Sequence, residues 1–276
     1  CLPIAIVFDL PERVCRERNA GRPDRDFGPH VIRNQVGNLR RSLRNLEREG
    51  FRYVFPLRSP EEVDVATVER QPLWNNKKTE TGPFDIIGDV HGCFDELRLL
   101  LDQLGYRLDT GGEPWRIEHP QGRKLVFVGD LVDRGPRVPD VLRLAMAAAK
   151  GGNGYCVVGN HDFKLVKALR GKQVRISHGL AESLEQLGRE SDAFRAEALN
   201  FLDGLISHYV FDGGRLVVAH AGLREEMHGR GSGKVREFAL YGETTGETDE
   251  YGLPVRYDWA ADYRGRAVVA YGHTPV

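Results

Sequence analysis

The sequence has 276 residues, which is long enough for one large α/β domain or for one domain with a smaller companion. With 41% hydrophobic and 29% charged residues and a net charge of -1, it excludes a disordered chain and a strongly basic nucleic-acid-binding protein. The four cysteines form no CxxC pair, which argues against a disulfide framework or a structural zinc site and is typical of a cytoplasmic protein. The longest apolar runs are shorter than the roughly 20 residues of a membrane span, so we expect no membrane association.

The first 69 residues predict a strand, a helix, a second strand and a second helix. The apolar run at 3–8 is typical of a buried strand, and the run at 51–55 predicts another. Between them, apolar side chains recur every three or four residues over 29–50, which predicts an amphipathic helix of about six turns. The sequence SPEE at 59–62 is a capping-box pattern that begins a short helix.

Beyond an aperiodic stretch at 70–83, which we expect to be a linker, five apolar strands each run into a polar cluster. They are FDIIGDVHG (84–92), KLVFVGDLVDRG (124–135), YCVVGNHD (155–162), RLVVAHAG (215–222) and AVVAYGHTPV (267–276). A sheet holds the backbone at a strand end, while the loop that follows can orient its side chains toward a ligand. Helical patterns fill part of the intervals, so the sequence predicts an α/β fold with a site at the strand ends.

The polar clusters carry residue types that bind transition metals. Imidazole and carboxylate groups with an amide oxygen suit Mn, Fe, Zn, Co or Ni better than Ca or Mg. A single strand-end Asp is more often a turn or cap residue, but turn preference does not explain five clusters of one chemistry. The candidate ligands are Asp89, His91, Asp130, Asn160, His220 and His273, and the glycines that directly precede four of the clusters, Gly88, Gly129, Gly159 and Gly272, would permit tight turns there.

The motifs GDVHG, GDLVDRG, GNHD, AHAG and GHTPV resemble those of the calcineurin-like metallophosphoesterase superfamily over 84–276. The resemblance implies a β-sandwich flanked by helices that binds two divalent metal ions, with manganese preferred and nickel, cobalt, iron or zinc as alternatives. It implies that Asp89, His91 and Asp130 hold the first ion and that Asp130, Asn160, His220 and His273 hold the second. Pro275 replaces the last histidine of the family pattern GHxH, as in the serine/threonine phosphatase and small-nucleotidase branch.

Phosphate-ester hydrolysis gives these residues distinct roles. Two cations about 4 Å apart lower the pKa of a bridging water and neutralise charge on the phosphoryl oxygens, and the bridging ligand, Asp130, must be a carboxylate. Arg134 can donate two parallel hydrogen bonds to phosphate oxygens, although an ion pair with Asp133 is the structural alternative. By the resemblance, His161 protonates the leaving alkoxide and Asp162 orients it; alternatively, Asp162 caps the helix that follows.

Two further stretches bear on the substrate. The segment 238–265 resembles an insert shared by bacterial polynucleotide kinase-phosphatases, which repair RNA ends, and a group that includes symmetrical bis(5'-nucleosyl)-tetraphosphatases. The segment 10–50 holds ten arginines against six acids, and part of it resembles the lid and lid helix of the P-loop kinase module in the kinase-phosphatases, although a solvated helix face is the usual explanation. The implied lid residues are Arg16, Arg18, Arg22 and Arg25.

We therefore predict the C-terminal part of a P-loop kinase domain at 1–69, a linker at 70–83 and a metallophosphoesterase domain at 84–276 that is truncated at its C-terminus. The chain would be the middle of a longer enzyme, without kinase activity because the motif GxxxxGK[ST] is absent. The predicted activity removes 2' or 3' phosphates from RNA ends, and also opens 2',3'-cyclic phosphates. RNA 3' ends or nucleotide phosphoesters are the expected substrates, with a homodimer and RNA-repair proteins as partners of the full-length enzyme.

Three alternatives stay open. Within the same superfamily, the chain could be a symmetrical bis(5'-nucleosyl)-tetraphosphatase or a serine/threonine protein phosphatase. Outside the enzymes, it could be a catalytically idle RNA-binding module that uses the arginines at 33–48 as its contact surface, for which RNA binding would depend on salt and not on metal.

Overall fold

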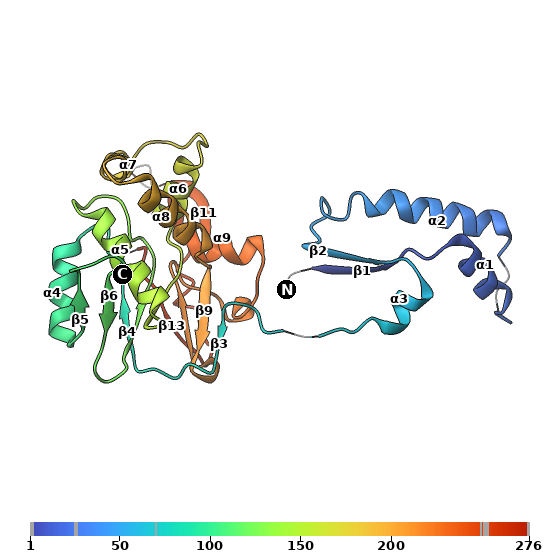
Figure 1. The fold of residues 1–276 in the computed structure, drawn as a ribbon, viewed down its shortest axis with the longest axis horizontal. Helices are drawn as coiled ribbons and strands as arrows, with labels where there is room; N and C mark the ends of the chain where they lie inside the picture. Colours follow the sequence, from blue (N-terminus) through green and yellow to red (C-terminus); the bar gives the residue numbers. More distant parts are fainter. Residues whose placement is uncertain (1–2, 25–26, 70, 249, 251–253, 275–276) are drawn as a thin grey trace. The chain divides into compact units, whose positions relative to one another are not determined.

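The computed structural model describes residues 3–24, 27–69, 71–248, 250 and 254–274. The chain divides into two compact units, Cys1–Gln71 and Pro72–Val276, which Figure 1 draws in one view. Within the described ranges, no helix is long and apolar enough to cross a membrane.

The first unit contains a two-stranded parallel sheet and three helices. Its elements are β1 (Ile4–Phe8), α1 (Glu12–Ala20), α2 (Pro29–Leu43), β2 (Tyr53–Leu57) and α3 (Pro60–Val65). The helix that we expected over 29–50 therefore ends at Leu43, before its apolar pattern ends. Its regular hydrogen bonds give way at the end to the tighter i,i+3 type, in which the Asn45 N–H donates to the Ser42 carbonyl at 2.9 Å, and turns follow as far as Gly50.

The strand that we expected to be buried at 3–8 is half exposed. Successive side chains of a strand point to opposite faces of the sheet. In β1 the alternate residues Ile4, Ile6 and Phe8 are exposed, as are Tyr53 and Phe55 of β2. One face of this small sheet is therefore apolar and uncovered in the described structure, which the apolar run in the sequence could not distinguish from burial on both faces.

Two β-sheets form the centre of the second unit (Figure 1). The strands of the first sheet, in spatial order, are β4 (Phe84–Ile87), β7 (Lys124–Phe127) and β8 (Gly154–Cys156); those of the second are β13 (Val268–Ala270), β10 (Leu216–Ala219), β9 (His208–Phe211) and β3 (Asn76–Lys77). The first sheet is parallel throughout. In the second, β9 and β10 are antiparallel, and the two outer strands run parallel to their neighbours.

Apolar side chains of the two sheets pack against each other. Val126 of β7 lies in one buried cluster with Phe211 of β9 and Val218 of β10. The ring of Phe84, from β4, packs on that cluster with its centroid 4.8 Å from the centroid of the Phe211 ring. The second unit is therefore a β-sandwich, as the sequence predicted.

Helices cover the outer faces of the sandwich. They are α4 (Phe94–Leu104), α5 (Val138–Lys150), α6 (Asn160–Leu169), α7 (Leu180–Gly188), α8 (Asp192–Gly204) and α9 (Gly233–Tyr241). Leu125 and Phe127 of β7 point away from the second sheet, into a large core cluster with Leu97 of α4 and side chains of α5 to α8. On the second sheet, Phe238 of α9 packs with Val217 of β10.

The stretch expected as a linker at 70–83 contributes a strand to the second sheet. There β3 pairs with β9, and the buried Asn75 side chain lies 3.0 Å from His208 Nε2.

The insert at 238–265 has partly regular secondary structure, because it contains the end of α9. The remaining elements of the unit are β5 (Arg107–Asp109), β6 (Arg116–Glu118), β11 (Thr244–Thr248), β12 (Pro254–Arg256) and two short 3-10 helices, η1 (Asp212–Gly214) and η2 (Glu225–Met227).

Removal of the Phe211 ring tests the contact between the two sheets. Phe211→Ala leaves a cavity in the sandwich, and we expect it to lower the free energy of unfolding by about 3–5 kcal/mol, measured by urea denaturation. The matched control is Leu99→Ala, at a 63% exposed position of α4, for which we expect little change. A similar loss in both variants would contradict this account of the core.

Candidate metal centre

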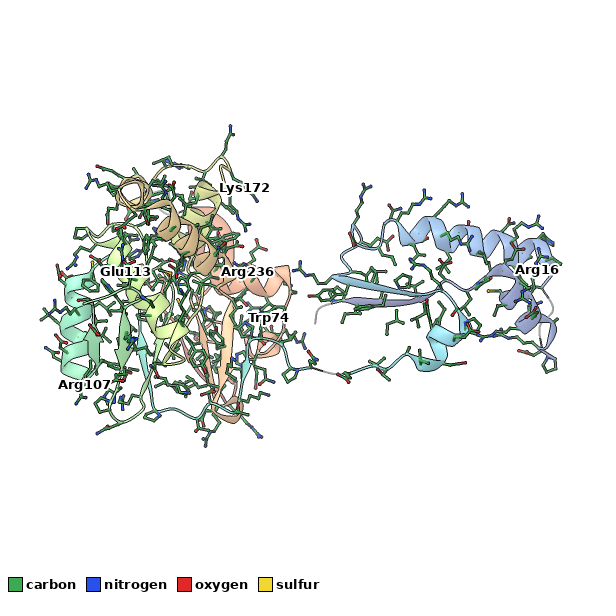
Figure 2. The ribbon with its side chains drawn as sticks, viewed as in Figure 1. Arg16, Trp74, Arg107, Glu113, Lys172 and Arg236 are labelled. Carbon is green, nitrogen blue, oxygen red and sulfur yellow. The ribbon has the colours of Figure 1, made fainter. Side chains whose placement is uncertain are left out.

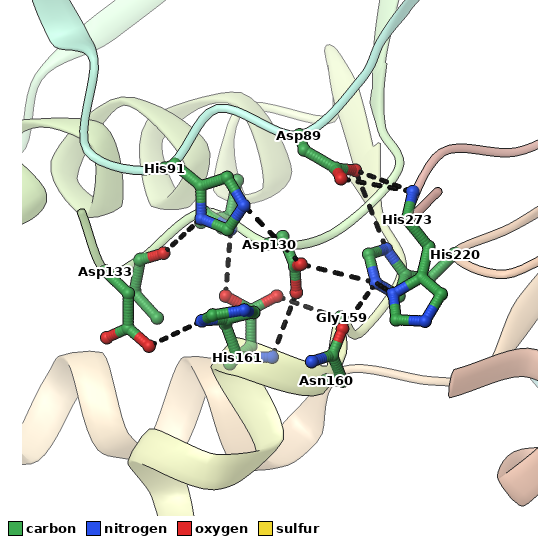
Figure 3. A network of polar contacts seen from close by, with 12 residues as sticks. Asp89, His91, Asp130, Asp133, Gly159, Asn160, His161, His220 and His273 are labelled. Atoms are coloured by element: carbon green, nitrogen blue, oxygen red, sulfur yellow. Dashed lines mark hydrogen bonds and ion pairs between the residues drawn. The ribbon is translucent and has the colours of Figure 1, made fainter. Parts of the chain in front are cut away.

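The predicted ligands meet at one edge of the sandwich, where five strands end. Parallel strands place their carboxyl ends at the same edge, and the loops that follow β4, β7, β8, β10 and β13 all reach this edge (Figure 3). In this order the loops supply Asp89 and His91, then Asp130, then Asn160 and His161, then His220, and last His273. Residues 184 positions apart thus come into contact, as in the hydrogen bond between the His273 N–H and Asp89.

Two groups of potential metal ligands share one carboxylate. His91, Asp130 and His161 form the first group, and Asp130, His220 and His273 form the second. Within each group, the potential ligand atoms lie within 4.8 Å of one another. Asp130 therefore lies where a carboxylate could contact two cations.

Asp130 is buried and ionised. Its Oδ1 accepts a hydrogen bond of 3.0 Å from the His161 N–H, and its Oδ2 lies 3.4 Å from His220 Nε2 and 3.7 Å from His91 Nε2. Burial acts to raise the pKa of Asp130, but the hydrogen bond and charge of His220 outweigh it and lower the pKa to about 2. The carboxylate is thus negative at neutral pH and suited to bind cations.

Backbone carbonyls orient two of the histidines. His91 Nδ1 lies 2.8 Å from the Val132 carbonyl oxygen, and His220 Nδ1 lies 3.0 Å from that of Val128. Since a carbonyl oxygen only accepts hydrogen bonds, Nδ1 carries the proton in each ring, and a neutral ring then presents the Nε2 lone pair to the site. Outer partners of this kind usually hold metal-binding histidines in place.

The second group fits a cation chemically. His220 Nε2 lies 2.9 Å from Asn160 Oδ1 and 3.0 Å from His273 Nδ1. Protonated His220 lowers the pKa of Asp130 and carries a proton on Nε2 as well. In the neutral ring the proton is on Nδ1 and the Nε2 lone pair faces the Asn160 oxygen, so two acceptors meet at hydrogen-bond distance in that form. A divalent ion that accepts electron pairs from nitrogen and oxygen together would satisfy this donor set.

Asp89 contacts residues of the second ligand group. Its carboxylate accepts a hydrogen bond of 3.1 Å from the His273 backbone N–H, and its Oδ1 is 3.8 Å from His220 Nδ1. Of the two ligand groups found among the described residues, neither includes Asp89. Its expected role beside His91 stays a prediction.

At two of the glycines, the carboxylate of another residue lies too close to allow a side chain. A Cβ on Gly159 would overlap the Asp130 carboxylate, and a Cβ on Gly272 would collide with that of Asp89. Neither glycine has a positive φ. The sequence correctly indicated that side chains are excluded here, but the reason is the nearby carboxylate and not the tight turn that we expected.

The acid that contacts His161 is Asp133 (Figure 3). The expected partner, Asp162, contacts other groups. His161 Nδ1 lies 2.6 Å from Asp133 Oδ2. Asp162 instead accepts hydrogen bonds of 2.9 Å from the N–H groups of Leu131 and Gly159. It caps α6 and ties the Asp130 loop to the start of that helix, which is the structural alternative considered for it.

Asp133 is itself held by Ser183 of α7. The Ser183 hydroxyl donates to Asp133 Oδ1 at 2.6 Å and accepts from the Asp133 N–H at 2.9 Å, and both residues are fully buried. Sequence reasoning missed this pair. Asp133 is part of the GDLVDRG motif and could have been noticed there, but Ser183 lies 50 positions away and no local pattern connects the two residues.

Arg134 is exposed and follows Asp133 with a φ of 66°. The structural alternative, an ion pair with Asp133, is not formed, because that carboxylate is occupied by His161 and Ser183. In the part of the chain that the structure describes, no hydrogen bond or ion pair involves the Arg134 guanidinium. It is therefore available to a phosphate group.

Three of the four predicted lid arginines, Arg16, Arg18 and Arg22, lie among the described residues of the first unit. Arg16 forms an ion pair with Glu12 of the same helix, and Figure 2 shows it on that unit. Arg18 and Arg22 are exposed, and Arg25 lies outside the described residues. These arginines fit the solvated helix face that was the alternative explanation.

Comparison with known proteins identifies the family. The profile of the calcineurin-like phosphoesterases matches residues 82–276. The chain belongs to this family. Its predicted metallophosphoesterase fold is confirmed, and so is its assignment as a phosphoester hydrolase; enzymes of this family use divalent metal ions.

Individual relatives within the family are tetraphosphatases. Proteins named bis(5'-nucleosyl)-tetraphosphatase PrpE [asymmetrical] from Halalkalibacterium halodurans and Bacillus subtilis are 45% and 43% identical to this chain, each over 197 residues. The matches cover 70% of this chain and 78% and 79% of the relatives. A crystal structure described as that of a candidate diadenosine tetraphosphatase is 27% identical with a TM-score of 0.50, and the match covers 72% of this chain and 78% of that one.

These relatives overturn the predicted identity. The prediction of a polynucleotide kinase-phosphatase acting on RNA ends is wrong, because the proteins that match at 43–45% identity are named as tetraphosphatases. The family match begins at residue 82, so it gives no support to a kinase fragment in the first unit. The open alternative of a tetraphosphatase was closer, although the relatives are named asymmetrical and we had considered the symmetrical type.

Leaving-group dependence tests the Ser183 and Asp133 contacts. Because nitrophenolate leaves without a proton and an alkoxide does not, we expect Ser183→Ala to lower kcat about tenfold on an alkyl phosphate and much less on p-nitrophenyl phosphate. Asp133→Asn should show a larger loss in the same direction, and Ser183→Thr, which keeps the hydroxyl, a smaller one. An equal loss on both substrates would rule out a positioning role for Ser183.

Arg134→Lys tests recognition of the phosphate. A lysine cannot donate two parallel hydrogen bonds, so we expect the KM for p-nitrophenyl phosphate to rise about tenfold with an unchanged melting temperature. Arg107→Lys on β5, an exposed arginine labelled in Figure 2, is the matched control and should leave KM as it is. An unchanged KM in Arg134→Lys would show that this side chain does not bind phosphate.

Proposed function

We propose that the chain hydrolyses dinucleoside tetraphosphates asymmetrically, to a nucleoside triphosphate and a nucleoside monophosphate. The observation that carries this proposal is the similarity to asymmetrical tetraphosphatases at 43–45% identity over 70% of the chain. The site is compatible with such a substrate, because a carboxylate shared by two ligand groups lies with the buried His161, and the same loop carries Arg134, whose guanidinium has no hydrogen bond or ion pair within the described chain.

The residues divide into metal ligands and groups that act on the substrate. We propose that Asp89, His91 and Asp130 hold one divalent ion and that Asp130, Asn160, His220 and His273 hold the other. When bound, two such ions supply Lewis-acid stabilisation and an activated water. The mixture of imidazole, carboxylate and amide donors favours manganese, with Ni, Co, Fe or Zn as alternatives.

The remaining groups handle charge and protons. Arg134 binds non-bridging phosphate oxygens, because nothing else in the described chain engages its guanidinium. His161 donates a proton from Nε2 to the departing phosphate oxygen, while Asp133 holds its Nδ1 at 2.6 Å and so fixes the ring. Asp162 has no direct contact with the substrate in this proposal and keeps the Asp130 loop in place through its two backbone hydrogen bonds.

Product analysis tests the proposal. Protein stripped of metal and reloaded with manganese should convert diadenosine tetraphosphate to equal amounts of ATP and AMP, resolved by ion-exchange chromatography, whereas the stripped protein should not. We expect Asp130→Asn to lower the rate at least about 100-fold, with Leu99→Ala as the control. Formation of ADP as the sole product, or no hydrolysis by the manganese-loaded protein, would refute asymmetrical cleavage.

A further inference from the structure

A cavity of about 270 Å³ lies beside the second ligand group. The strand end that carries the metal-site residue His273 forms one wall, through Gly272 and His273 themselves. The end of β12 and the segment that follows it also line the cavity, through Arg256, Tyr257 and Trp259. The cavity is thus continuous with the metal centre, but none of the residues contributed by the insert has a role in the chemistry described above.

One wall of the cavity is a fixed aromatic surface. The Trp259 indole packs so closely on Gly222 that a Cβ there would overlap it. Its ring centroid lies 5.1 Å from that of Tyr271, which also lines the cavity, and 6.3 Å from that of Phe238 in α9. These contacts leave Trp259 little freedom, so the wall exists before any ligand arrives.

Tyr257 differs from these packed rings. It is 53% exposed, and it makes no ring contact with another described aromatic residue. Its backbone is nevertheless held, because its N–H donates to the Glu243 carbonyl at 2.9 Å. A tyrosine on a fixed backbone with a free ring face at the mouth of a cavity is suited to stack on a flat ligand.

Arg256 contributes a guanidinium to the cavity lining, and Asp258 contributes a carboxylate whose Oδ1 accepts a hydrogen bond of 3.1 Å from the Ala261 N–H. Arg256 Nε donates to the Tyr241 carbonyl at 3.0 Å, which anchors the side chain. Over the described part of the chain, no carboxylate forms an ion pair with it. A flat aromatic ligand that carries negative charge matches a cavity with aromatic walls and one such guanidinium.

We propose that this cavity binds the nucleoside of one end of the dinucleoside tetraphosphate, with the base stacked on Tyr257. The proposal rests on the tetraphosphatase function proposed above. Pockets for drug-sized ligands have volumes of about 300–1,000 Å³, so a cavity of about 270 Å³ suits one nucleoside and not two. Arg256 then contacts the phosphate chain that leaves the cavity.

This placement explains the position of cleavage. Because His273 lines the cavity and also belongs to the second ligand group, the first phosphate after the bound nucleoside lies at the metal centre. The oxygen of water forms a bond to that phosphorus, and the bond from the same phosphorus to the bridging oxygen breaks. The bridging oxygen leaves on a nucleoside triphosphate with a proton from His161, and a nucleoside monophosphate remains.

Competition between two monophosphates tests the subsite. AMP and ribose 5-phosphate carry the same phosphate, but only AMP has a base. With manganese-loaded protein acting on p-nitrophenyl phosphate, we expect an inhibition constant about tenfold lower for AMP than for ribose 5-phosphate. The ratio of the two constants should fall to about one in Tyr257→Ala and persist in Tyr257→Phe, which keeps the ring.

The controls separate this proposal from the proposed function. Tyr53→Ala, at an exposed tyrosine of the first unit, should keep the wild-type ratio, and melting temperatures show whether each variant is folded. Equal inhibition by AMP and ribose 5-phosphate in the wild-type protein, or an unchanged ratio in Tyr257→Ala, would overturn the subsite even if diadenosine tetraphosphate still gives ATP and AMP. A preserved tenfold ratio in protein that does not cleave this substrate would sustain the subsite and refute the tetraphosphatase.

Discussion

The burial of one ionised carboxylate, that of Asp130, is the constraint on which the rest of the site depends. A buried charge is costly unless cations or hydrogen-bond donors surround it. The loop 128–134 meets this demand, because its carbonyls orient His220 and His91 toward the carboxylate. Through Asp133, the same loop also holds His161. One seven-residue loop after β7 therefore determines the geometry of both ligand groups and of the proposed proton donor.

The sandwich makes this arrangement possible because it brings two sheets to a common edge. The first sheet supplies Asp130 and the second supplies His220 and His273, so neither sheet contains a complete second group. Contact between the sheets, through side chains such as Phe211, keeps the two contributions at bonding distance. The segment after α9 then adds an aromatic cavity at this edge, where we propose that a nucleoside binds, separately from the chemistry at the phosphate.

The wrong prediction of RNA ends as the substrate has a physical explanation. The five strand-end motifs bind metal, a property common to enzymes that act on many phosphate esters, so they carry no information on the rest of the substrate. The arginines of the first unit suggested phosphate binding by their number and by the resemblance of their segment to a kinase lid. In the structure Arg16 pairs with Glu12, and Arg40 lies 3.3 Å from Asp9, so part of this charge is balanced by nearby acids. A charge count cannot distinguish such pairing from a ligand site.

The sequence by itself determined the five strands that lead to the site, the family fold and the set of candidate ligands, because periodicity and ligand type are properties of short segments. Only the tertiary structure decided which acid holds His161, since Asp133 meets His161 from 28 positions away and Ser183 meets Asp133 from 50 positions away along the chain. It also placed the Asp89 carboxylate at the backbone N–H of His273, and it set Tyr257 in the lining of the cavity that His273 shares. These outcomes depend on how loops from separate strands pack together, which no local pattern in the sequence encodes.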